Sequence, residues 1–400
     1  MIPYSEAIQI ILNHAINYGT ESVSIHNCLN RVLDEAIMSK RDSPPFNRSA
    51  MDGYAIRKED YDNGIRKFEI IETIYAGASY TKELLTNQCY KIMTGASVPH
   101  SANAVIRNED AKETNQFVTF VDISLKHFNN IAKQGEDFVK GKEILQKGKL
   151  CNSLVVSALA SNGNAHIKVK KTPTVSVIST GNELIPLTNE PNSTQIYDSN
   201  KYAIHSFLSA YGIQAINLPI VKDDESALFQ SITKALSSEI VIITGGVSAG
   251  DADFVPKVLE QLGAKKVFHK VAIKPGKPIW FGTFENNKRI FSLPGNPLSV
   301  QVAFKIFIEP YLRKCLELNE LPIFQFPLVQ EKKKKTNLDE FFLCQIQISD
   351  KIQLVPTKMN GSGDILSPVL SHGIGIHAHD REYIGINETC PFIFWNGIEL

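Results

Sequence analysis

Three glycine-rich loops follow one another closely in the chain: Thr244–Asp253, Lys274–Pro278 and Ser292–Ser299. Each loop comes directly after a short apolar run. A strand that ends in a glycine-rich turn leaves backbone N–H groups at the C-terminal edge of an open α/β sheet, where ligands bind. Lysines and carboxylates alternate in these loops, and a carboxylate tolerates a phosphate only when a divalent cation lies between them. The pattern therefore predicts a phosphorylated ligand held with Mg²⁺.

Carboxylates stand at two of these strand ends. Asp253 lies at the start of an expected helix just after a glycine loop, and we expect it to contact a metal or ligand. Asp251 can do the same or can simply cap the helix. Thr180-Gly181-Asn182-Glu183 repeats the strand-then-glycine design, and Glu183 adds a carboxylate at the same edge. No Ser-His-Asp order, zinc-ligand spacing or Walker lysine motif is present.

The segment His269–Lys277 carries three lysines. In an extended strand Lys270 and Lys274 share one face, about 13 Å apart, and Lys277 follows on the turn. Such a line of cations can span an extended polyanion. An exposed edge strand protected by lysines is the alternative, but the apolar segments on both sides favour the ligand interpretation. Pro294 and Pro297 stiffen the next loop, around Gly295 and Asn296, as a site for an oxyanion.

A β-rich insert contributes three further motifs: Ser43–Ile56, Lys91–Val98 and Gln134–Asp137. Taken singly, each is typical of a turn; Asp52-Gly53 is a common hairpin sequence, and Thr94 can bind a ligand or cap its turn. The His377–Asp380 run resembles a metal-binding sequence, but we expect a satisfied polar strand end. For Lys332–Lys335 we expect a solvated linker or strand edge.

The composition excludes several classes of protein. The 400 residues carry 42 basic and 42 acidic side chains, which gives no electrostatic basis for binding nucleic acid or an anionic membrane. No stretch approaches the length of a membrane span, and the N-terminus has the spacing of a surface helix rather than of a signal. The six scattered cysteines suit reduced thiols. We expect a cytoplasmic, multidomain protein.

The order of apolar runs predicts a multidomain α/β plus β fold. Strands alternate with helices over 172–318, which indicates an α/β domain with a parallel-rich sheet. Residues 47–138 form a β-rich insert that interrupts a discontinuous helical and extended domain, 1–46 and 139–171. Residues 319–400 form a small, barrel-like C-terminal β domain.

Taken in order, the motifs PPFNRSAMDGYA, IMTGASVP, GED, STGNEL, TGGVSAGDADF, AIKPGKP and LPGNP resemble the molybdopterin molybdenumtransferases, the family of MoeA and the gephyrin E domain. The resemblance implies that molybdate is inserted into adenylylated molybdopterin with Mg²⁺-dependent release of AMP. It implies a homodimer whose active site is shared between subunits. It also implies transient contact with molybdopterin adenylyltransferase or with acceptor molybdoenzymes.

The family motifs assign roles to individual residues. Those given a catalytic role are Asp52, Thr94, Asp137, Glu183, Asp223 and Asp253. Those expected to bind the pterin substrate are Gly245, Gly246, Ser248, Gly250, Lys270, Lys274, Lys277, Pro294, Gly295, Asn296 and Pro297. Those expected to hold Mg²⁺ are Asp52, Glu183 and Asp253, although the sequence does not separate metal ligands from pterin ligands.

The chain departs from the family around Asp339–Ile346, where an Arg-x-x-Phe-x-Arg-like pattern is replaced by Leu, Cys and Gln. The Gly361–Asp364 loop is the remaining C-terminal candidate for the site. Two other functions stay open. Molybdopterin adenylyltransferase shares the α/β module but is usually a single domain, and a gephyrin-like scaffold would need a peptide groove in the C-terminal domain.

Overall fold

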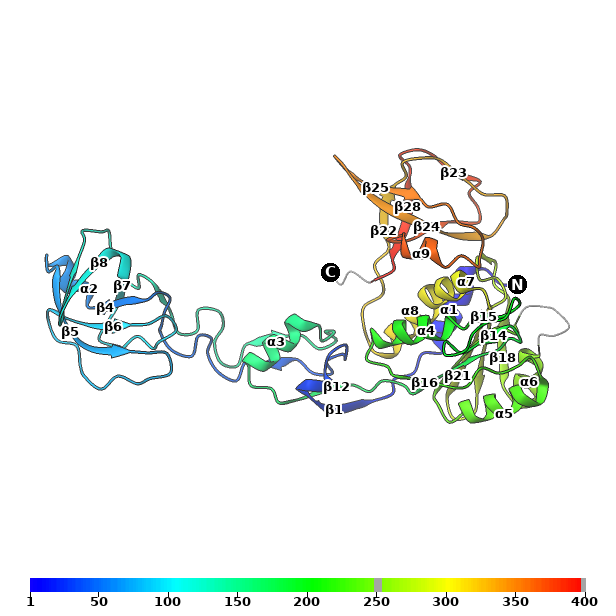
Figure 1. Cartoon of the computed structure of the whole chain (residues 1–400), viewed down its shortest axis with the longest axis horizontal. Helices are drawn as coiled ribbons and strands as arrows, with labels where there is room; N and C mark the ends of the chain where they lie inside the picture. Colours follow the sequence, from blue (N-terminus) through cyan, green and yellow to red (C-terminus); the bar gives the residue numbers. More distant parts are fainter. Residues whose placement is uncertain (248–253, 397–400) are drawn as a thin grey trace. The chain divides into compact units, whose positions relative to one another are not determined.

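The computed structural model of the chain describes residues 1–247 and 254–396 (Figure 1). They form two compact units. The first comprises Met1–Glu35, Gly148–Val156 and His166–Leu400, and the second comprises Ala36–Lys147 and Ser157–Ala165. The predicted multidomain α/β plus β fold is confirmed, whereas the predicted four-part division of the chain stays a prediction.

The central sheet of the first unit has the strand order β16-β13-β17-β21-β20-β18. Its strands are β13 (Val175–Ser179), β16 (Ala215–Asn217), β17 (Ile240–Thr244), β18 (Lys265–His269), β20 (Trp280–Phe284) and β21 (Lys288–Leu293). β16, β13, β17 and β21 run parallel to one another. β20 runs antiparallel to both of its neighbours, β21 and β18. Ser179 is in register with Thr244, which is in register with Leu293. Three of the strand-end loops therefore begin level with one another.

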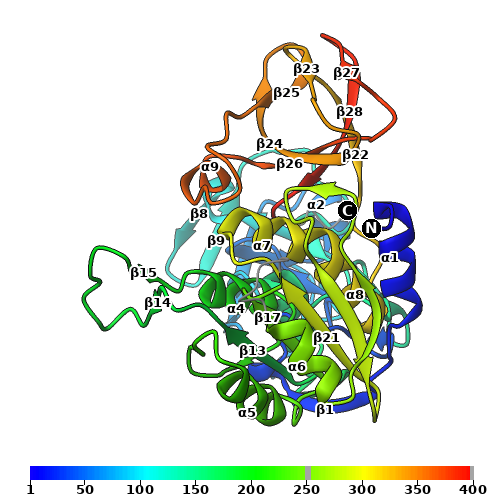
Figure 2. The ribbon, with the colours of Figure 1, turned by 90° about the vertical axis from the view of Figure 1, so that its right-hand side faces the viewer.

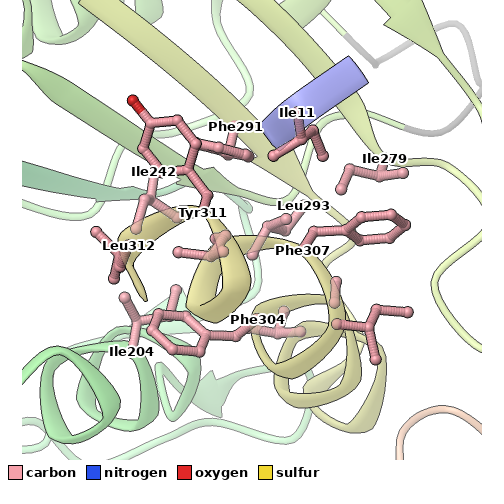
Figure 3. Packing of buried hydrophobic residues seen from close by; sticks show 14 of the residues in the cluster. Ile11, Ile204, Ile242, Ile279, Phe291, Leu293, Phe304, Phe307, Tyr311 and Leu312 are labelled. Atoms are coloured by element: carbon pink, nitrogen blue, oxygen red, sulfur yellow. The ribbon is translucent and has the colours of Figure 1, made fainter. Parts of the chain in front are cut away.

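Helices cover both faces of this sheet because its strands are apolar on both sides. Ile240 and Ile242 of β17 join one buried cluster, and Val241 and Ile243 join another. The first cluster packs against α1 (Tyr4–Asn13), α4 (Asn200–Ser209), α7 (Pro297–Ala303), the π-helix η3 (Phe304–Ile308) and α8 (Glu309–Cys315); the second packs against α5 (Glu225–Ala235) and α6 (Val255–Gln261). Figure 3 shows the first cluster, where Phe304, Phe307 and Tyr311 pack among branched aliphatic side chains.

One expected strand is wrong. The chain does not run extended from Lys270 to Lys274, because β18 ends at His269 and Lys270 has a φ of 69°. The carbonyl of Lys270 accepts a hydrogen bond from the Ile2 N–H (3.2 Å), and its N–H donates to the Ile279 carbonyl (2.9 Å). β19 (Ile273–Lys274) instead pairs with a strand of the C-terminal sheet. Lys270 and Lys274 therefore do not share one strand face.

The C-terminal sheet has the order β19-β24-β26-β28-β22, with β25 paired to β24. These strands are β22 (Phe324–Pro327), β24 (Asp339–Ile348), β25 (Ile352–Pro356), β26 (Gly373–His377) and β28 (Thr389–Phe394). The short helix α9 (Leu366–Val369) follows the Gly361–Asp364 loop. A separate ribbon pairs β23 (Lys332–Lys333) with β27 (Tyr383–Ile384). Ile348 pairs with Ile352, so that the three residues 349–351 connect β24 to β25.

Smaller pairs complete the first unit. β1 (Thr20–Ser24) pairs with β12 (His166–Lys170), and η1 (Ile25–Asn27) follows β1. β14 (Leu184–Ile185) and β15 (Ile196–Tyr197) form a ribbon that projects beside α4 (Figure 2). Helix α3 spans Ser153–Ser161.

The second unit is built on a sheet with the order β7-β4-β6-β5-β9-β8. Its strands are β4 (Gly53–Ile56), β5 (Lys67–Ile74), β6 (Gln88–Ile92), β7 (Ala104–Arg107), β8 (Ala111–Thr114) and β9 (Phe117–Phe120). Short elements surround them: β2 (Ile37–Met38) with β11 (Glu143–Leu145), β3 (Arg48–Ser49) with β10 (Ile131–Ala132), α2 (Lys58–Asp62) and η2 (Asn108–Asp110). All six cysteines of the chain are buried free thiols. Within the described residues, no helix is both long and apolar enough to cross a membrane.

Candidate functional site

A cavity of about 360 Å³ opens at the C-terminal edge of the parallel strands. Three strand-end loops line it because β13, β17 and β21 end level with one another: Thr180–Glu183, Thr244–Val247 and Pro294–Pro297. Asp223 and the start of α4, Asp198–Asn200, complete the wall. The cavity therefore lies where ligands bind in open α/β sheets.

Three carboxylates line this cavity: Glu183, Asp198 and Asp223. No lysine or arginine is among its described lining residues. Asp223 is held in place because Thr180 donates its hydroxyl hydrogen to Oδ1 (2.8 Å) and the Asn182 N–H donates to Oδ2 (3.3 Å). Asp198 is buried, with its Oδ2 3.5 Å from the ammonium of Lys201. The described lining of the cavity thus carries excess negative charge.

The carboxylates of this cavity suit a Mg²⁺ ion that takes part of its oxygen ligands from a substrate phosphate. Nowhere in the described part of the chain do three or more His, Cys, Asp or Glu side chains gather as a complete metal site. Mg²⁺ keeps several waters and usually takes one or two protein carboxylates together with substrate phosphates. Glu183 and Asp223 fit that incomplete donor set, in which a bound phosphate supplies the remaining oxygens.

The turn after β17 needs glycine at positions 245 and 246, because its backbone has positive φ angles and leaves no room for a Cβ atom. Gly245 has a φ of 92°, and a Cβ there would lie 2.2 Å from the Thr180 carbonyl oxygen. Gly246 has a φ of 60°, and its Cβ would lie 2.8 Å from a methyl of Val255. Only glycine satisfies both demands, so this turn keeps its backbone close to the ligand cavity.

The Pro294–Pro297 loop is tied to its neighbours on both sides. The Asn200 side-chain amide donates to the Gly295 carbonyl (2.6 Å). The Asn296 amide donates to Ser362 Oγ (2.7 Å), and the Leu298 N–H donates to the Ser362 carbonyl (3.1 Å). The C-terminal Gly361–Asp364 loop therefore supports this part of the site.

A second cavity of about 420 Å³ is cationic and meets the first. It is lined by Lys274 and Lys277 together with Ser299 and Ser362. The two cavities share Pro278, Pro294 and Asn296. The site consequently has an acidic half and a basic half joined at the Pro294–Pro297 loop. Lys270 does not line either half, so its role stays a prediction.

The basic half also has an apolar side, where Leu338 lines the cavity. The Leu, Cys and Gln that stand where the family resemblance implies arginine, Leu343, Cys344 and Gln345, are not among its described lining residues. Glu340 lines it too, but its carboxylate is engaged 2.8 Å from the ammonium of Lys332. Lys332 is therefore an ion-pair partner, and together with Lys333 it forms the short strand β23, in line with the expected strand edge rather than with a solvated linker.

The second unit holds the other predicted site residues. Asp52 Oδ1 accepts hydrogen bonds from the Thr94 N–H (2.6 Å) and from the Thr94 hydroxyl (2.8 Å), which lower the pKa of Asp52. Asp137 accepts a hydrogen bond from the Ser43 hydroxyl (3.1 Å). Both carboxylates are exposed. The pairing of Asp52 with Thr94 places two sequence-predicted residues in contact.

Some predicted site residues lie outside the described residues: Ser248, Gly250, Asp251 and Asp253. Conversely, the sequence interpretation missed Asp198 and Asn200, which line the acidic half. Their signal was present as a short apolar pair, Ile196-Tyr197, followed by Asp-Ser-Asn at a helix start.

Comparison with known proteins gives consistent matches along the chain. Residues 2–163 match the MoeA N-terminal region (domain I and II), and residues 176–314 match a probable molybdopterin binding domain. A molybdopterin molybdenumtransferase of Staphylococcus epidermidis is 32% identical over 375 residues, which cover 92% of this chain and 89% of the relative. One from Synechocystis is 30% identical over 407 residues, covering 99% and 100%. The crystal structure of a molybdopterin biosynthesis MoeA protein from Pyrococcus horikosii superposes with a TM-score of 0.77 at 29% identity and covers 100% of both chains.

Proposed function

Because the chain belongs to the molybdopterin molybdenumtransferase family, we propose that it inserts molybdate into adenylylated molybdopterin and releases AMP in a Mg²⁺-dependent reaction. The observation that carries the proposal is the division of the site into an acidic and a basic half that share Asn296. Such a site suits one substrate with a metal-bound phosphoanhydride and a second substrate that is itself an oxyanion.

The acidic half would hold the phosphoanhydride. Glu183 and Asp223 would bind Mg²⁺, which would neutralise the phosphate charge, make the adenylyl phosphorus easier to attack and make the molybdopterin phosphate a better leaving group. The Gly245-Gly246 turn lies beside them. The Gly245 N–H already donates to the Leu293 carbonyl (3.1 Å), whereas the Gly246 N–H makes no hydrogen bond with a described residue and would be a donor to a phosphate oxygen. Asp223 needs no reorientation, because Thr180 and Asn182 already hold both of its oxygens.

The basic half would hold molybdate. Lys274 and Lys277 supply two positive charges to a tetrahedral dianion, and the hydroxyls of Ser299 and Ser362 add donors. Positioning and electrostatics then account for catalysis, with no protein nucleophile. A molybdate oxygen attacks the adenylyl phosphorus, the anhydride P–O bond breaks, and its bridging oxygen leaves with the molybdopterin phosphate. Transfer of molybdenum to the dithiolene sulfurs then breaks the Mo–O bond, so that the attacking oxygen remains in the AMP released.

The decisive experiment measures AMP release from adenylylated molybdopterin with Mg²⁺, with and without molybdate. Asp223→Asn should abolish molybdate-dependent release. Asp224→Asn is the matched control, because Asp224 caps α5 by accepting from the Ala227 N–H (2.8 Å) and asparagine caps equally well. Release that needs no molybdate, or release unchanged in Asp223→Asn, would contradict the proposal. ATP consumption in the absence of molybdate would instead indicate an adenylyltransferase.

Labelled molybdate tests the chemical step. With freshly mixed ¹⁸O-molybdate in unlabelled water, and a single turnover quenched before molybdate exchanges its oxygens with the solvent, we expect one ¹⁸O atom in each AMP released. Oxygen taken from water alone would show that water, and not molybdate, attacks phosphorus.

A further inference from the structure

Two polar runs of the C-terminal domain converge at one place outside the site described above. β23 pairs with β27, with Lys332 opposite Ile384 and Lys333 opposite Tyr383. The two strands lie together at one end of the C-terminal domain (Figure 2). This pairing brings the lysine run 332–335 beside the segment 379–383. Residues 333–337 and 379–383 together line a cavity of about 600 Å³. The site is separate from the Lys274 and Lys277 cavity, since the two share no lining residue.

The cavity is not built for a metal ion. His377 is fully buried beneath the ribbon and is not among its lining residues. The ring of His379 is engaged by Asp339, whose Oδ1 lies 3.1 Å from Nδ1. In the described structure these residues form no group of three metal-binding side chains. β26 ends at His377, but both buried ring nitrogens of His377 lack a hydrogen-bond partner among the described residues, so the expected satisfied polar strand end is wrong at this residue.

Some of the cations around the cavity already have partners. Lys333 lies 3.1 Å from Glu331, and Arg381 lies 2.7 Å from Glu388. These pairs leave little charge for a ligand.

Lys334 and Lys335 differ from their neighbours. Neither ammonium lies within ion-pair distance of a carboxylate anywhere in residues 1–247 or 254–396. Lys334 is anchored by donating to the carbonyls of Leu338 (3.2 Å) and Ala378, and burial lowers its pKa. Asp339, Asp380 and Glu340 act on this ammonium from beyond ion-pair distance and offset only part of the cost of burying its charge, so that a bound anion would offset more of it.

The same loop offers unused donors. The N–H groups of Lys335, Thr336, Asn337 and Leu338 form no hydrogen bond with any described residue. The side-chain hydroxyl of Thr336, which lines the cavity, is enclosed and is likewise without a partner among the described residues. Successive free N–H groups beside cations are the usual composition of an anion site.

From these observations we propose that the Lys334–Asn337 loop binds a tetrahedral dianion of the phosphate and molybdate class. Two ammonium groups balance two negative charges, and the free N–H groups and the threonine hydroxyl satisfy the oxygens. Asp380 and Glu382 also line the cavity. Their charge disfavours a long polyanion and restricts the ligand to a compact one. The site adds an oxyanion-binding function that the proposed reaction does not require.

The test is a titration of the full-length protein with inorganic phosphate, and separately with molybdate, at constant ionic strength. Residue-resolved amide NMR reports on Thr336 and Asn337. The titration is made in the Lys274→Gln/Lys277→Gln background. Oxyanion binding at these two lysines of the proposed active site then does not contribute to the measured affinity. We expect saturable shifts of these amides and at least a tenfold weaker affinity in Lys334→Met/Lys335→Gln.

Lys265→Gln is the control for net charge, because Lys265 is an exposed lysine on β18, outside this cavity. It should leave the affinity unchanged. Amide shifts that fail to saturate, or that match those produced by chloride, would overturn the proposal, as would equal affinity in the double-lysine variant. Should the amides escape detection, equilibrium dialysis with radiolabelled phosphate in the same variants gives the same comparison. Saturation by phosphate alone or by molybdate alone identifies which oxyanion the loop selects.

Discussion

Asn200 holds the Gly295 carbonyl at 2.6 Å, and this contact joins the first turn of α4 to the Pro294–Pro297 loop. Asn200 is buried, and Gly295 lies between the two prolines that stiffen the loop. One side chain therefore fixes the boundary between the acidic and basic halves of the site. The loop carries Asn296, which both halves share.

Replacing the Asn200 side chain should lower kcat/KM strongly while lowering the free energy of unfolding only moderately. In Asn200→Ala the Gly295 carbonyl loses its partner, which costs about 1–3 kcal/mol in the free energy of unfolding. A loop displaced by roughly 1 Å lowers kcat/KM by about 100-fold. Ser238→Ala is the control, because it breaks the buried hydrogen bond to Ser176 (2.7 Å) near the opposite end of the strands. Steady-state kinetics beside urea unfolding separate the two effects. If both variants lost the same activity, the effect of Asn200→Ala would come from lower stability, and Asn200 would not position the loop of the site.

The Gly245 turn should be intolerant of any side chain. Gly245→Ala places a Cβ 2.2 Å from the Thr180 carbonyl oxygen and forces a φ of 92° on alanine. We expect a loss of more than about 2 kcal/mol in unfolding free energy. Gly363→Ala, where an added Cβ meets nothing within 4 Å, should cost less than about 1 kcal/mol. Thermal melting of both variants checks this, and similar melting temperatures would contradict it.

Much of this arrangement could be predicted from the sequence, because each strand end carries its own local signal. The loops at Thr180, Thr244 and Ser292 each follow an apolar run, so their meeting at one sheet edge required only that β13, β17 and β21 be parallel neighbours. The contact between Asp52 and Thr94 was not predicted, although the family resemblance implied a catalytic role for each residue.

What could not be predicted depended on tertiary contacts. An apolar-polar alternation over 270–274 favours a strand, but Lys270 adopts a left-handed conformation because its backbone bonds to Ile2 and Ile279. The link between Asn296 and Ser362 joins positions 66 residues apart and has no local signature.

Leu338 should set the affinity of the basic half for its oxyanion. It lines that cavity and is only partly buried, so that a longer side chain has room to extend. Leu338→Arg adds a third cation beside Lys274 and Lys277, which is worth about 1 kcal/mol, or roughly a fivefold lower KM for molybdate. Leu338→Gln, of similar size but neutral, should leave KM nearly unchanged. An unaltered KM in a folded Leu338→Arg protein would place molybdate elsewhere.

The contact between Thr94 and Asp52 predicts a pH effect. Hydrogen bonds from Thr94 lower the pKa of the Asp52 carboxyl, so that this group stays ionised at pH values below those of an ordinary aspartate. Thr94→Val removes the hydroxyl donor and should raise this pKa, moving the acidic limb of kcat/KM to higher pH. Thr94→Ser keeps the hydroxyl and should keep the limb in place. An acidic limb that is the same in all three proteins would exclude Asp52 as an ionised participant.

Mixing two inactive variants tests the proposed sharing of the active site between subunits. Asp52 belongs to the second compact unit and Asp223 to the first. In a heterodimer of Asp52→Asn and Asp223→Asn subunits, a site built from both partners would regain one intact copy. Random exchange makes about half of the dimers mixed, so we expect about a quarter of wild-type AMP release after the subunits are unfolded and refolded together. The separately refolded variants, combined afterwards at the same concentrations, control for exchange. Sedimentation must show that the co-refolded sample contains dimers. If these dimers recover no AMP release, either both carboxylates belong to a site within one subunit or the two do not act in the same site.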